Sequence, residues 1–290
     1  MVIGALEAGG TKMVCAVGDE YGNIAKRTVF PTDKPDITMP EMIGFFKQEA
    51  VQALGIGCFG PLDLDKNSAN YGTITSTPKT AWRQFPIVDT FVKALHIPVV
   101  LDTDVNVAAL GEATWGAGVG DDTVLYITIG TGVGAGICIG GKLLHGLVHP
   151  EAGHILLARR QDDSFEGTCP YHQNCLEGLV SGPAIKGRWG ESAEKLSDNS
   201  QVWEMEADYI AQALTNYILV CSPNRIILGG GVMHQLSLFP LIREKVKVYL
   251  NGYVVHPMLE HDIDQYIVPP LLKDNAGIKG ALQLAIASGK

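Results

Sequence analysis

Four potential metal ligands lie within one short segment of the second half of the chain. The segment, residues 149–178, reads HPEAGHILLARRQDDSFEGTCPYHQNCLEG. Cys169, His172 and Cys175 are spaced closely enough to meet on a turn, and His154 can supply a fourth donor. Zinc prefers four nitrogen and sulfur donors in a tetrahedron, and four protein ligands leave no position for water or substrate. The segment predicts a structural zinc site, and the alternative is a set of unrelated surface residues.

Three glycine-rich loops each follow an apolar segment: AGGTK at 8–12, GTGVGAG at 130–136 and GGGVM at 229–233. Glycine lets successive backbone N–H groups approach an anion, so these loops predict phosphate contacts. The sequence holds no P-loop motif. GTGVGAG matches a dinucleotide-binding pattern, but the residues after it are typical of a strand, whereas that pattern must open a helix. A plain hairpin turn remains the alternative for any single loop.

A candidate general base lies in the sequence DTDVN, which follows an apolar strand and precedes a helix. Loops at such places present polar groups to a site, and a positioned carboxylate such as Asp104 can accept a proton there. A helix N-cap fits the same position equally well. The pattern alone leaves base and cap open.

The composition fits a folded enzyme and excludes some partners. The chain has 290 residues, 46% of them hydrophobic, and a formal charge of −9. Its length suits one large domain or two ordinary ones, and its charge disfavours binding to nucleic acid. No apolar run approaches the length that spans a bilayer, so we expect a cytoplasmic protein with reduced thiols and no membrane partner. The other four cysteines are interpreted as core residues: Cys15, Cys58, Cys138 and Cys221.

Two similar α/β halves are expected to position these residues. Residues 2–30 predict three antiparallel strands, and residues 123–146 repeat the pattern of strand, glycine turn and strand. Later segments predict a helix near 40–52, a polar turn before the helix that follows DTDVN, and an amphipathic helix at about 200–221. We expect an N-terminal domain at 1–117, onto which a last helix at about 274–290 packs, and a C-terminal domain at 118–273 that carries the zinc-binding segment 154–175.

Several motifs together resemble the landmarks of the ROK family of sugar kinases and repressors. In chain order they are EAGGTK, TDVNVAALGE, IGTGVGAG, HPEAGH, the Cys/His cluster, SGPA and ILGGGVM. The resemblance covers essentially the whole chain, and among family members the sequence is similar to bacterial fructokinases. It implies the actin-like, ribonuclease-H-like ATPase fold, with two domains flanking a cleft where ATP and sugar meet, and it favours a homodimer. It also implies ATP and Mg²⁺ as well as structural zinc.

The resemblance also implies roles for individual residues. Asp104 becomes the catalytic base, because the family's catalytic aspartate precedes x-Asn. The residues implied around the sugar are Gly60, Pro61, Asn106, Glu151, His154 and Glu177. Those implied around the nucleotide are Gly9, Gly10, Thr11, Gly130, Thr131, Gly132, Pro183, Gly229, Gly230, Gly231, Val232 and Met233. The zinc ligands are His154, Cys169, His172 and Cys175, with His172 at a place often held by cysteine.

Three positions depart from the family's usual pattern. Thr103 stands where members usually have asparagine, Gly60-Pro61 stands where many have Pro-Gly, and Glu7 replaces the commoner aspartate of the first loop. A longer carboxylate at position 7 can still orient Mg²⁺ through water.

The sequence therefore predicts an ATP-dependent hexose kinase, with fructose as the favoured acceptor. Glucose, mannose and an N-acetylhexosamine remain alternatives, followed by a sugar-responsive repressor and a non-catalytic ATPase module. The sequence RRQDD at 159–163 is interpreted as a solvated loop. Surface or core polarity is expected for the remaining histidines, which are His96, His145, His149, His234, His256 and His261.

Overall fold

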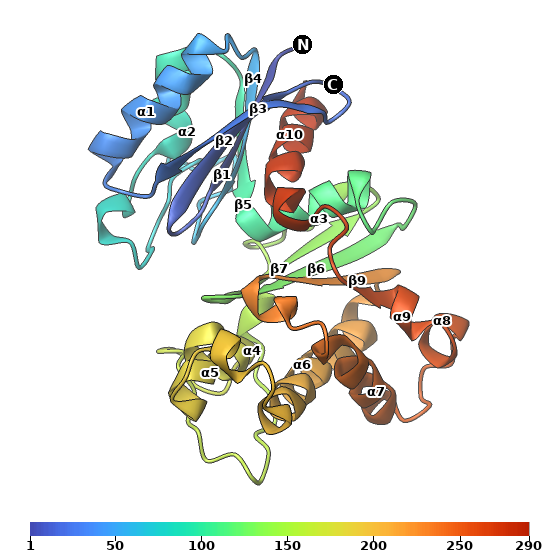
Figure 1. Cartoon of the computed structure of the whole chain (residues 1–290). Helices are drawn as coiled ribbons and strands as arrows, with labels where there is room; N and C mark the ends of the chain where they lie inside the picture. The colour runs from blue at the N-terminus through green and yellow to red at the C-terminus, as the bar shows by residue number, and fades with distance from the viewer. Residues whose placement is uncertain (290) are drawn as a thin grey trace. The chain divides into compact units, whose positions relative to one another are not determined.

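The computed structural model describes residues 1–289, and its contacts divide the chain into two compact α/β units (Figure 1). The first unit contains residues 1–119, residues 136–150 and the residues from Leu272 onward. The second contains residues 120–135 and 151–271. The domain limits expected at 117 and 273 stay a prediction, and residues 136–150 group with the first unit.

A five-stranded sheet of order β3-β2-β1-β4-β5 forms the centre of the first unit. Its strands are β1 (Ile3–Ala8), β2 (Lys12–Gly18), β3 (Ile24–Pro31), β4 (Ala53–Cys58) and β5 (Val99–Thr103). The first three strands are antiparallel, as expected, whereas β4 and β5 run parallel to β1. Because parallel strands end at one edge of a sheet, the residues that follow β1, β4 and β5 are brought to the same edge.

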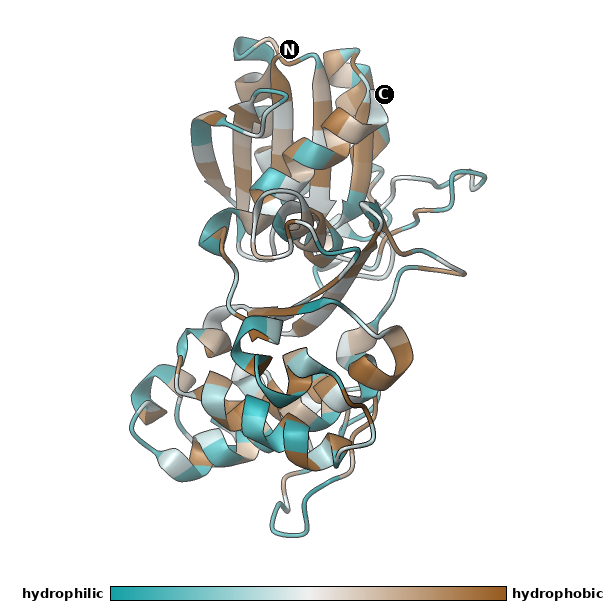
Figure 2. Cartoon of the chain, turned by 90° about the vertical axis from the view of Figure 1, so that its right-hand side faces the viewer, coloured by the Kyte–Doolittle hydropathy of each residue, from teal (hydrophilic) through white to brown (hydrophobic). Residues whose placement is uncertain are grey.

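Helices cover the two faces of this sheet. Their bounds are α1 (Pro35–Gln48), α2 (Ile87–Leu95), α3 (Asp104–Trp115) and α10 (Ala276–Ser288). Apolar side chains of α1 and α2, such as Phe46 and Phe91, pack with Leu6 and Ile56 in one buried cluster. Residues of α10, such as Leu282, pack against the opposite face. In Figure 2 the strands of this sheet are coloured largely brown, as hydrophobic residues.

The second sheet has the order β10-β9-β6-β7-β8. Its strands are β6 (Thr123–Ile129), β7 (Val133–Ile139), β8 (Lys142–Leu143), β9 (Arg225–Gly229) and β10 (Ile267–Val268). The helices of the second unit are α4 (Leu176–Val180), α5 (Gly182–Trp189), α6 (Ser200–Cys221), α7 (Leu238–Leu250), α8 (Pro257–Glu260) and α9 (Ile263–Tyr266). β7 follows its glycine turn directly, which agrees with the rejection of the dinucleotide-binding pattern. None of the helices described at 1–289 combines the length and apolarity that crossing a bilayer requires.

The structure corrects parts of the expected element list. The helix expected near 40–52 is α1, which begins earlier because Pro35 suits the first helical turn. No polar turn separates β5 from α3, since the helix begins at Asp104 immediately after the strand. Helices α2, α4 and α5 were not expected, and the last two are too short for a helical period to emerge from the sequence.

Helices α3 and α10 cross with their backbones in close contact. A Cβ atom on Gly280 would lie 1.5 Å from the carbonyl oxygen of Val107, and one on Gly111 would lie 2.4 Å from that of Ala276. Glycine is therefore required for steric reasons at this crossing. The crossing fixes α3, whose first residue is Asp104, against the sheet.

We expect Gly280→Ala to lower the free energy of unfolding by about 1–3 kcal/mol, because the added methyl group must displace the α3 backbone. Gly44→Ala in α1 is the matched control, since no heavy atom lies within 4 Å of its Cβ position. That substitution should stabilise the protein by about 1 kcal/mol through helix propensity. Urea unfolding of both variants makes the comparison, and equal effects would contradict the steric explanation.

Candidate active site and metal centre

Asp104 occupies the first residue of α3, and Thr103 takes the capping role. The Thr103 hydroxyl oxygen accepts a hydrogen bond from the backbone N–H of Asn106 at 3.1 Å. Asp104 itself lies inside the helix, where its Oδ1 accepts from the N–H of Val105 at 2.9 Å. The sequence left open whether Asp104 caps the helix or acts as a base. The structure excludes the capping role, because Thr103 is the N-cap, and the role of base stays a prediction.

Glu7 lies near the end of β1, at the same sheet edge, and is partly buried. Burial, and after it the negative charge of Asp104, together raise the pKa of Glu7 to about 7, while Lys12 opposes the shift. A Cβ atom on Gly277 would lie 2.8 Å from the Glu7 carboxyl carbon, so the first turn of α10 packs against this side chain. Carboxylates are ligands that Mg²⁺ accepts, and the charge pattern fits a cation at this edge.

Gly60 and Pro61 follow β4, also at this edge, and a cis peptide bond joins them. The carbonyl oxygen of Pro61 accepts hydrogen bonds from the N–H and the hydroxyl of Thr75, at 2.9 and 3.0 Å. A Cβ atom on Gly60 would lie 3.9 Å from Nε2 of His149. The structure therefore brings the implied sugar residues Gly60, Pro61 and Asn106 into one unit with Asp104.

In the second unit, three of the implied nucleotide segments converge on Gly130. The N–H of Gly182 donates to the carbonyl oxygen of Gly130 at 2.7 Å, which places Pro183 beside the β6–β7 turn. A Cβ atom on Gly130 would lie 3.8 Å from the N of Gly231. Gly230 has a φ of 89° and packs against Ile129, an arrangement that needs glycine.

The other implied nucleotide residues lie partly in the first unit and partly in the second. Gly9, Gly10 and Thr11 form the β1–β2 turn of the first unit, where the Thr32 hydroxyl donates to the Gly9 carbonyl oxygen at 2.7 Å. Thr131 is exposed at the β6–β7 turn. Val232 and Met233 are buried, so their side chains serve packing and only their backbone can meet a ligand.

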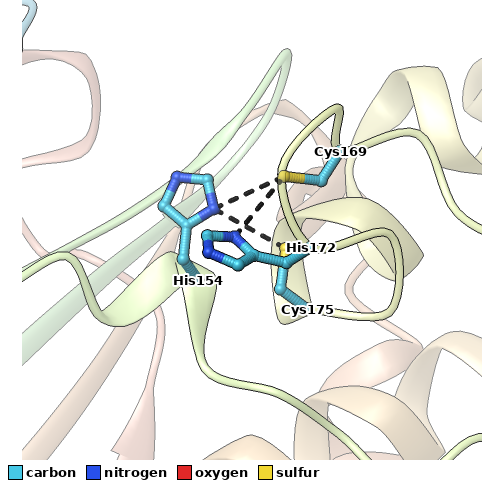
Figure 3. A group of neighbouring side chains, drawn as sticks. All are labelled: His154, Cys169, His172 and Cys175. Carbon is cyan, nitrogen blue, oxygen red and sulfur yellow. Dashed lines mark hydrogen bonds between the residues drawn. The ribbon is translucent and has the colours of Figure 1, made fainter.

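The four predicted metal ligands converge in the second unit (Figure 3). Nδ1 of His154 lies 3.7 Å from Sγ of Cys169 and 3.6 Å from Sγ of Cys175. Nδ1 of His172 lies 3.8 Å from Sγ of Cys169, and all four donor atoms are within 4.8 Å of one another. In a tetrahedral zinc site the donor atoms are roughly 3.3–3.8 Å apart, given the usual Zn–S and Zn–N lengths. The donor set therefore fits zinc.

Burial explains why this cluster suits a cation. Cys169 and Cys175 are both buried, and burial raises the pKa of the Cys175 thiol to about 11. The thiol therefore stays protonated unless a cation stabilises the thiolate, which is the form that binds metal.

His154 can serve both of the roles implied for it, because its two ring nitrogens are distinct. Nδ1 faces the cysteines, which leaves Nε2 at the opposite side of the ring (Figure 3). The residue ends a short 3₁₀ helix, Ala152–His154, and its N–H donates to the carbonyl oxygen of Glu151. A metal at Nδ1 would thus fix the ring that presents Nε2.

Glu177 links the metal segment to the glycine turn. It lies in the first turn of α4, two residues after Cys175, and its Oε2 accepts from the N–H of Val133 at 3.0 Å. A Cβ atom on Gly132 would lie 2.7 Å from the same oxygen. One carboxylate oxygen of this implied sugar residue is therefore occupied by the β6–β7 turn.

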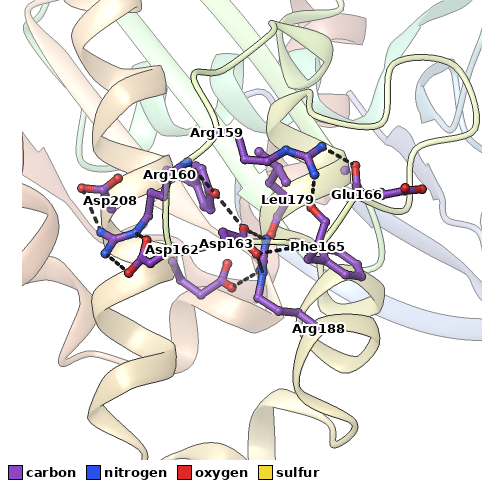
Figure 4. A network of polar contacts seen from close by, with 12 residues as sticks. Arg159, Arg160, Asp162, Asp163, Phe165, Glu166, Leu179, Arg188 and Asp208 are labelled. Carbon is purple, nitrogen blue, oxygen red and sulfur yellow. Dashed lines mark hydrogen bonds and ion pairs between the residues drawn. The ribbon is translucent and has the colours of Figure 1, made fainter.

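A buried ion network supports the same segment, so the interpretation of RRQDD as a solvated loop is wrong for Asp163 (Figure 4). Arg188 contacts Asp163 at 3.1 Å and Glu206 at 2.8 Å, and both acidic side chains are at most 3% exposed. The hydroxyl of Tyr209 donates to Asp163 at 2.7 Å. Burial raises the pKa of Glu206 to about 8, against the opposing charge of Arg188.

Sequence reasoning missed the pairing of His145 with Asp102. Nε2 of His145 lies 2.9 Å from Oδ2 of Asp102, a contact between residues far apart in the chain that no motif announces. His149 is buried, whereas the side chain of His145 is 39% exposed. Cys221 is only partly buried, so its assignment to the core holds less well than that of Cys15, Cys58 and Cys138.

The fold and the site together define a class of protein. Each unit is built on a five-stranded sheet with an antiparallel hairpin, glycine turns follow the strands, and an aspartate begins the helix after β5. These are features of an actin-like α/β ATPase. The sequence profile of the ROK family matches residues 3–288, and the chain belongs to that family.

Relatives and solved structures agree with this assignment. The chain is 55% identical to a Bacillus subtilis (strain 168) protein named "Putative fructokinase", over 98% of this chain and 95% of that protein. It is 45% identical to the fructokinase of Pediococcus pentosaceus, over 100% and 99% of the two chains. A Streptomyces griseus ROK family glucokinase, solved in complex with glucose and AMPPNP, is 27% identical, with a TM-score of 0.75 over 98% and 99% of the two chains.

We expect stability to fall as pH rises through the titration of Glu7. Its folded pKa of about 7 lies above the ordinary 4.5, so between these values the folded protein binds one proton more than the unfolded chain. The free energy of unfolding therefore decreases across this window, by at most roughly 3 kcal/mol. Urea unfolding at pH 5 and pH 8 should show a smaller decrease for Glu7→Gln than for wild type. Glu41→Gln, at an exposed position, should follow wild type, and a Glu7→Gln slope equal to wild type would contradict the assignment.

We expect about one zinc ion per chain in protein purified without chelator, measured by elemental analysis. Cys169→Ser should lose the ion, because three donors bind zinc far less tightly than four. Its melting temperature should fall by roughly 5–10 °C, equivalent to about 2–3 kcal/mol. Cys221→Ser is the control and should keep the metal, since this cysteine is not part of the cluster. Zinc retained in Cys169→Ser would contradict the proposed ligand set.

Proposed function

We propose that the protein transfers the γ-phosphoryl group of ATP to a hydroxyl of a hexose, with D-fructose as the preferred acceptor and fructose 6-phosphate as the product. The observation that carries the proposal is the position of Asp104 at the head of α3, capped by Thr103 and beside a second carboxylate. Identity of 45–55% to proteins named as fructokinases supports fructose as the acceptor.

Asp104 acts as the general base in this proposal. Its carboxylate accepts the proton of the sugar hydroxyl as that oxygen attacks the γ-phosphorus, and the bond from that phosphorus to the bridging oxygen of ADP breaks. A positioned base of this kind contributes about 10²–10⁴-fold to the rate. Asp104 suits the task because the helix backbone already fixes its Oδ1.

Backbone amides supply the contacts to the phosphates. The turn at Gly130–Gly132 is held by Gly182, which donates to the Gly130 carbonyl oxygen, and by Glu177, which accepts from the N–H of the next residue, Val133. The N–H of Gly130 donates to the carbonyl oxygen of Gly132, so the N–H groups assigned to the phosphates are those of Thr131 and Gly132. Fixed donors need not reorganise as charge develops on the transferred group. Mg²⁺ bound with ATP would neutralise charge at the phosphates, and Glu7 and Asp104 are the carboxylates that would orient it.

The metal cluster has a supporting role in this proposal. Zinc held by four protein ligands has no open position, so it shapes the loop and takes no part in the reaction. The segment it holds carries Glu151 and His154 at one end and Glu177 at the other. We assign these three residues to the sugar hydroxyls, together with Gly60, Pro61 and Asn106.

Asp104→Asn should lower kcat by about 10²–10⁴-fold, because an amide cannot accept the hydroxyl proton. Its melting temperature should stay close to that of wild type, since the amide oxygen can still accept from the N–H of Val105. Turnover is measured with ATP·Mg and a panel of fructose, glucose, mannose and N-acetylhexosamines. Asp198→Asn, at an exposed position, is the charge-matched control.

Full activity in Asp104→Asn would contradict the mechanism while leaving the reaction intact. Transfer to another hexose in preference to fructose would contradict the substrate, and the absence of transfer to any sugar in wild type would contradict the proposed function itself.

A further inference from the structure

The carboxylate of Asp102 accepts hydrogen bonds from three groups. Its Oδ1 accepts from the N–H of Thr103 at 2.8 Å and from Nδ2 of Asn106 at 2.7 Å. Its Oδ2 faces Nε2 of His145 at 2.9 Å. The residue is only 4% exposed, so these contacts replace water at the carboxylate. Asp102 lies two residues before Asp104 in the sequence DTDVN, and its carboxylate oxygens are occupied by these contacts.

This arrangement fixes the orientation of the Asn106 side chain. An ionised carboxylate can only accept hydrogen bonds, so the group that Asn106 turns toward Asp102 must be its NH₂. The amide oxygen of Asn106 therefore points away from Asp102. Asn106 is 1% exposed, and within the described part of the chain its Oδ1 has no hydrogen-bond partner.

A buried acceptor without a partner is energetically unfavourable, by about 1–3 kcal/mol. Such groups are rare in folded proteins and call for an explanation, such as a ligand that supplies the missing donor. Asn106 lies in the first turn of α3, two residues after Asp104. A hydroxyl donor bound next to Asp104 is the natural partner for this oxygen.

We propose that Asp102 and His145 are positioning residues that hold the Asn106 amide so that its Oδ1 accepts a hydrogen bond from a hydroxyl of the acceptor sugar. The proposal rests on the kinase function proposed above and extends it. Neither Asp102 nor His145 touches the reacting atoms. Their effect on the sugar passes through Asn106 alone.

The surroundings of His145 make the pair sensitive to pH. His145 lies just after β8, and its side chain is 39% exposed in a cavity of about 990 Å³. The hydrogen bond to Asp102 raises the pKa of His145, whereas burial and the charge of Lys66 lower it. The other titratable side chains that line this cavity are Asp63, Asp65, Tyr71, Lys142 and His149.

The direction of the pH effect follows from the pairing. Below the pKa of His145 the contact is an ion pair, which is about twice as strong as a neutral hydrogen bond. As pH rises through that pKa the charge is lost and Asp102 is held less firmly. The KM for the sugar should therefore rise with pH in wild type, while the KM for ATP should not follow it.

The test compares His145→Ala, His145→Gln and Asp102→Asn with wild type. His145→Ala should raise the KM for fructose by about tenfold, the effect of losing one charge-assisted hydrogen bond, with kcat changed by less than about threefold. His145→Gln keeps a donor without a titrating charge, so its KM should be intermediate and independent of pH. His261→Gln is the matched control, since His261 is exposed.

A measurement on the free protein checks the pair independently of turnover. The ring resonances of His145 are titrated by NMR in wild type and in Asp102→Asn, where the pKa should fall toward its ordinary value of about 6.5. An unchanged pKa in Asp102→Asn would overturn the pairing.

The kinetic outcomes separate a positioning role from a structural one. Equal loss of affinity for ATP and sugar in His145→Ala, or a fall in kcat with unchanged KM, would overturn the proposal. If wild type transfers phosphate to no hexose, the kinase function fails instead. The NMR titration then still decides whether the pair exists, and thermal shift of the free protein with fructose decides whether sugar binding depends on it.

Discussion

The hydrogen bond from the N–H of Asn106 to the hydroxyl of Thr103 is the contact on which the first unit's site depends. It starts α3 immediately after β5, with no intervening loop, and so leaves Asp104 no conformational freedom at the backbone. The close crossing of α3 with α10, where Gly111 and Gly280 admit the opposing backbone, prevents the helix from shifting. A carboxylate at the first position of a packed helix is held more rigidly than one on a loop, which is what general base catalysis requires.

The second unit solves a different physical problem, because its site segment has almost no regular secondary structure. Residues 155–175 include no helix and only isolated bridges of β structure, so packing alone does not fix them. Two polar anchors take its place: the Cys/His cluster and the ion network around Arg188. Removing one partner of a buried charge pair is strongly destabilising, because it leaves the other charge unpaired in the interior. The loss of any one side chain of the network is therefore expected to destabilise the segment; its members are Arg188, Asp163 and Glu206. Both anchors join the segment to α4 and α5, which carry Glu177 and Pro183.

Features made by residues close together in the sequence could be predicted, whereas contacts between distant residues could not. The Cys/His cluster was predictable because three of its members share one turn, and α6 was predictable because it is long and amphipathic. The two α/β halves followed from a repeated strand and turn pattern, whereas the actin-like fold was implied by the resemblance to the ROK family. Nothing local to His145 or Asp163 reveals its partner, because the pairings depend on how distant elements pack. The capping role of Thr103 was hidden for another reason: Asp104 is an equally good cap in sequence, and only backbone geometry distinguishes them.

The threonine at position 103 and the pairing of Asp102 with His145 are physically connected. An asparagine at position 103 would offer both a donor and an acceptor through its amide. The Thr103 hydroxyl oxygen accepts from the Asn106 N–H, which holds it at the start of the helix. The side-chain amide of the first turn of α3 is then that of Asn106, and an amide is useful for recognition only if its two ends cannot exchange. Asp102 prevents the exchange, because turning the amide oxygen toward a carboxylate would set two acceptors 2.7 Å apart with no proton between them. His145 completes the arrangement by contacting the other carboxylate oxygen of Asp102. The cap of α3 and the orientation of the Asn106 amide are therefore set by neighbouring contacts at the same helix terminus.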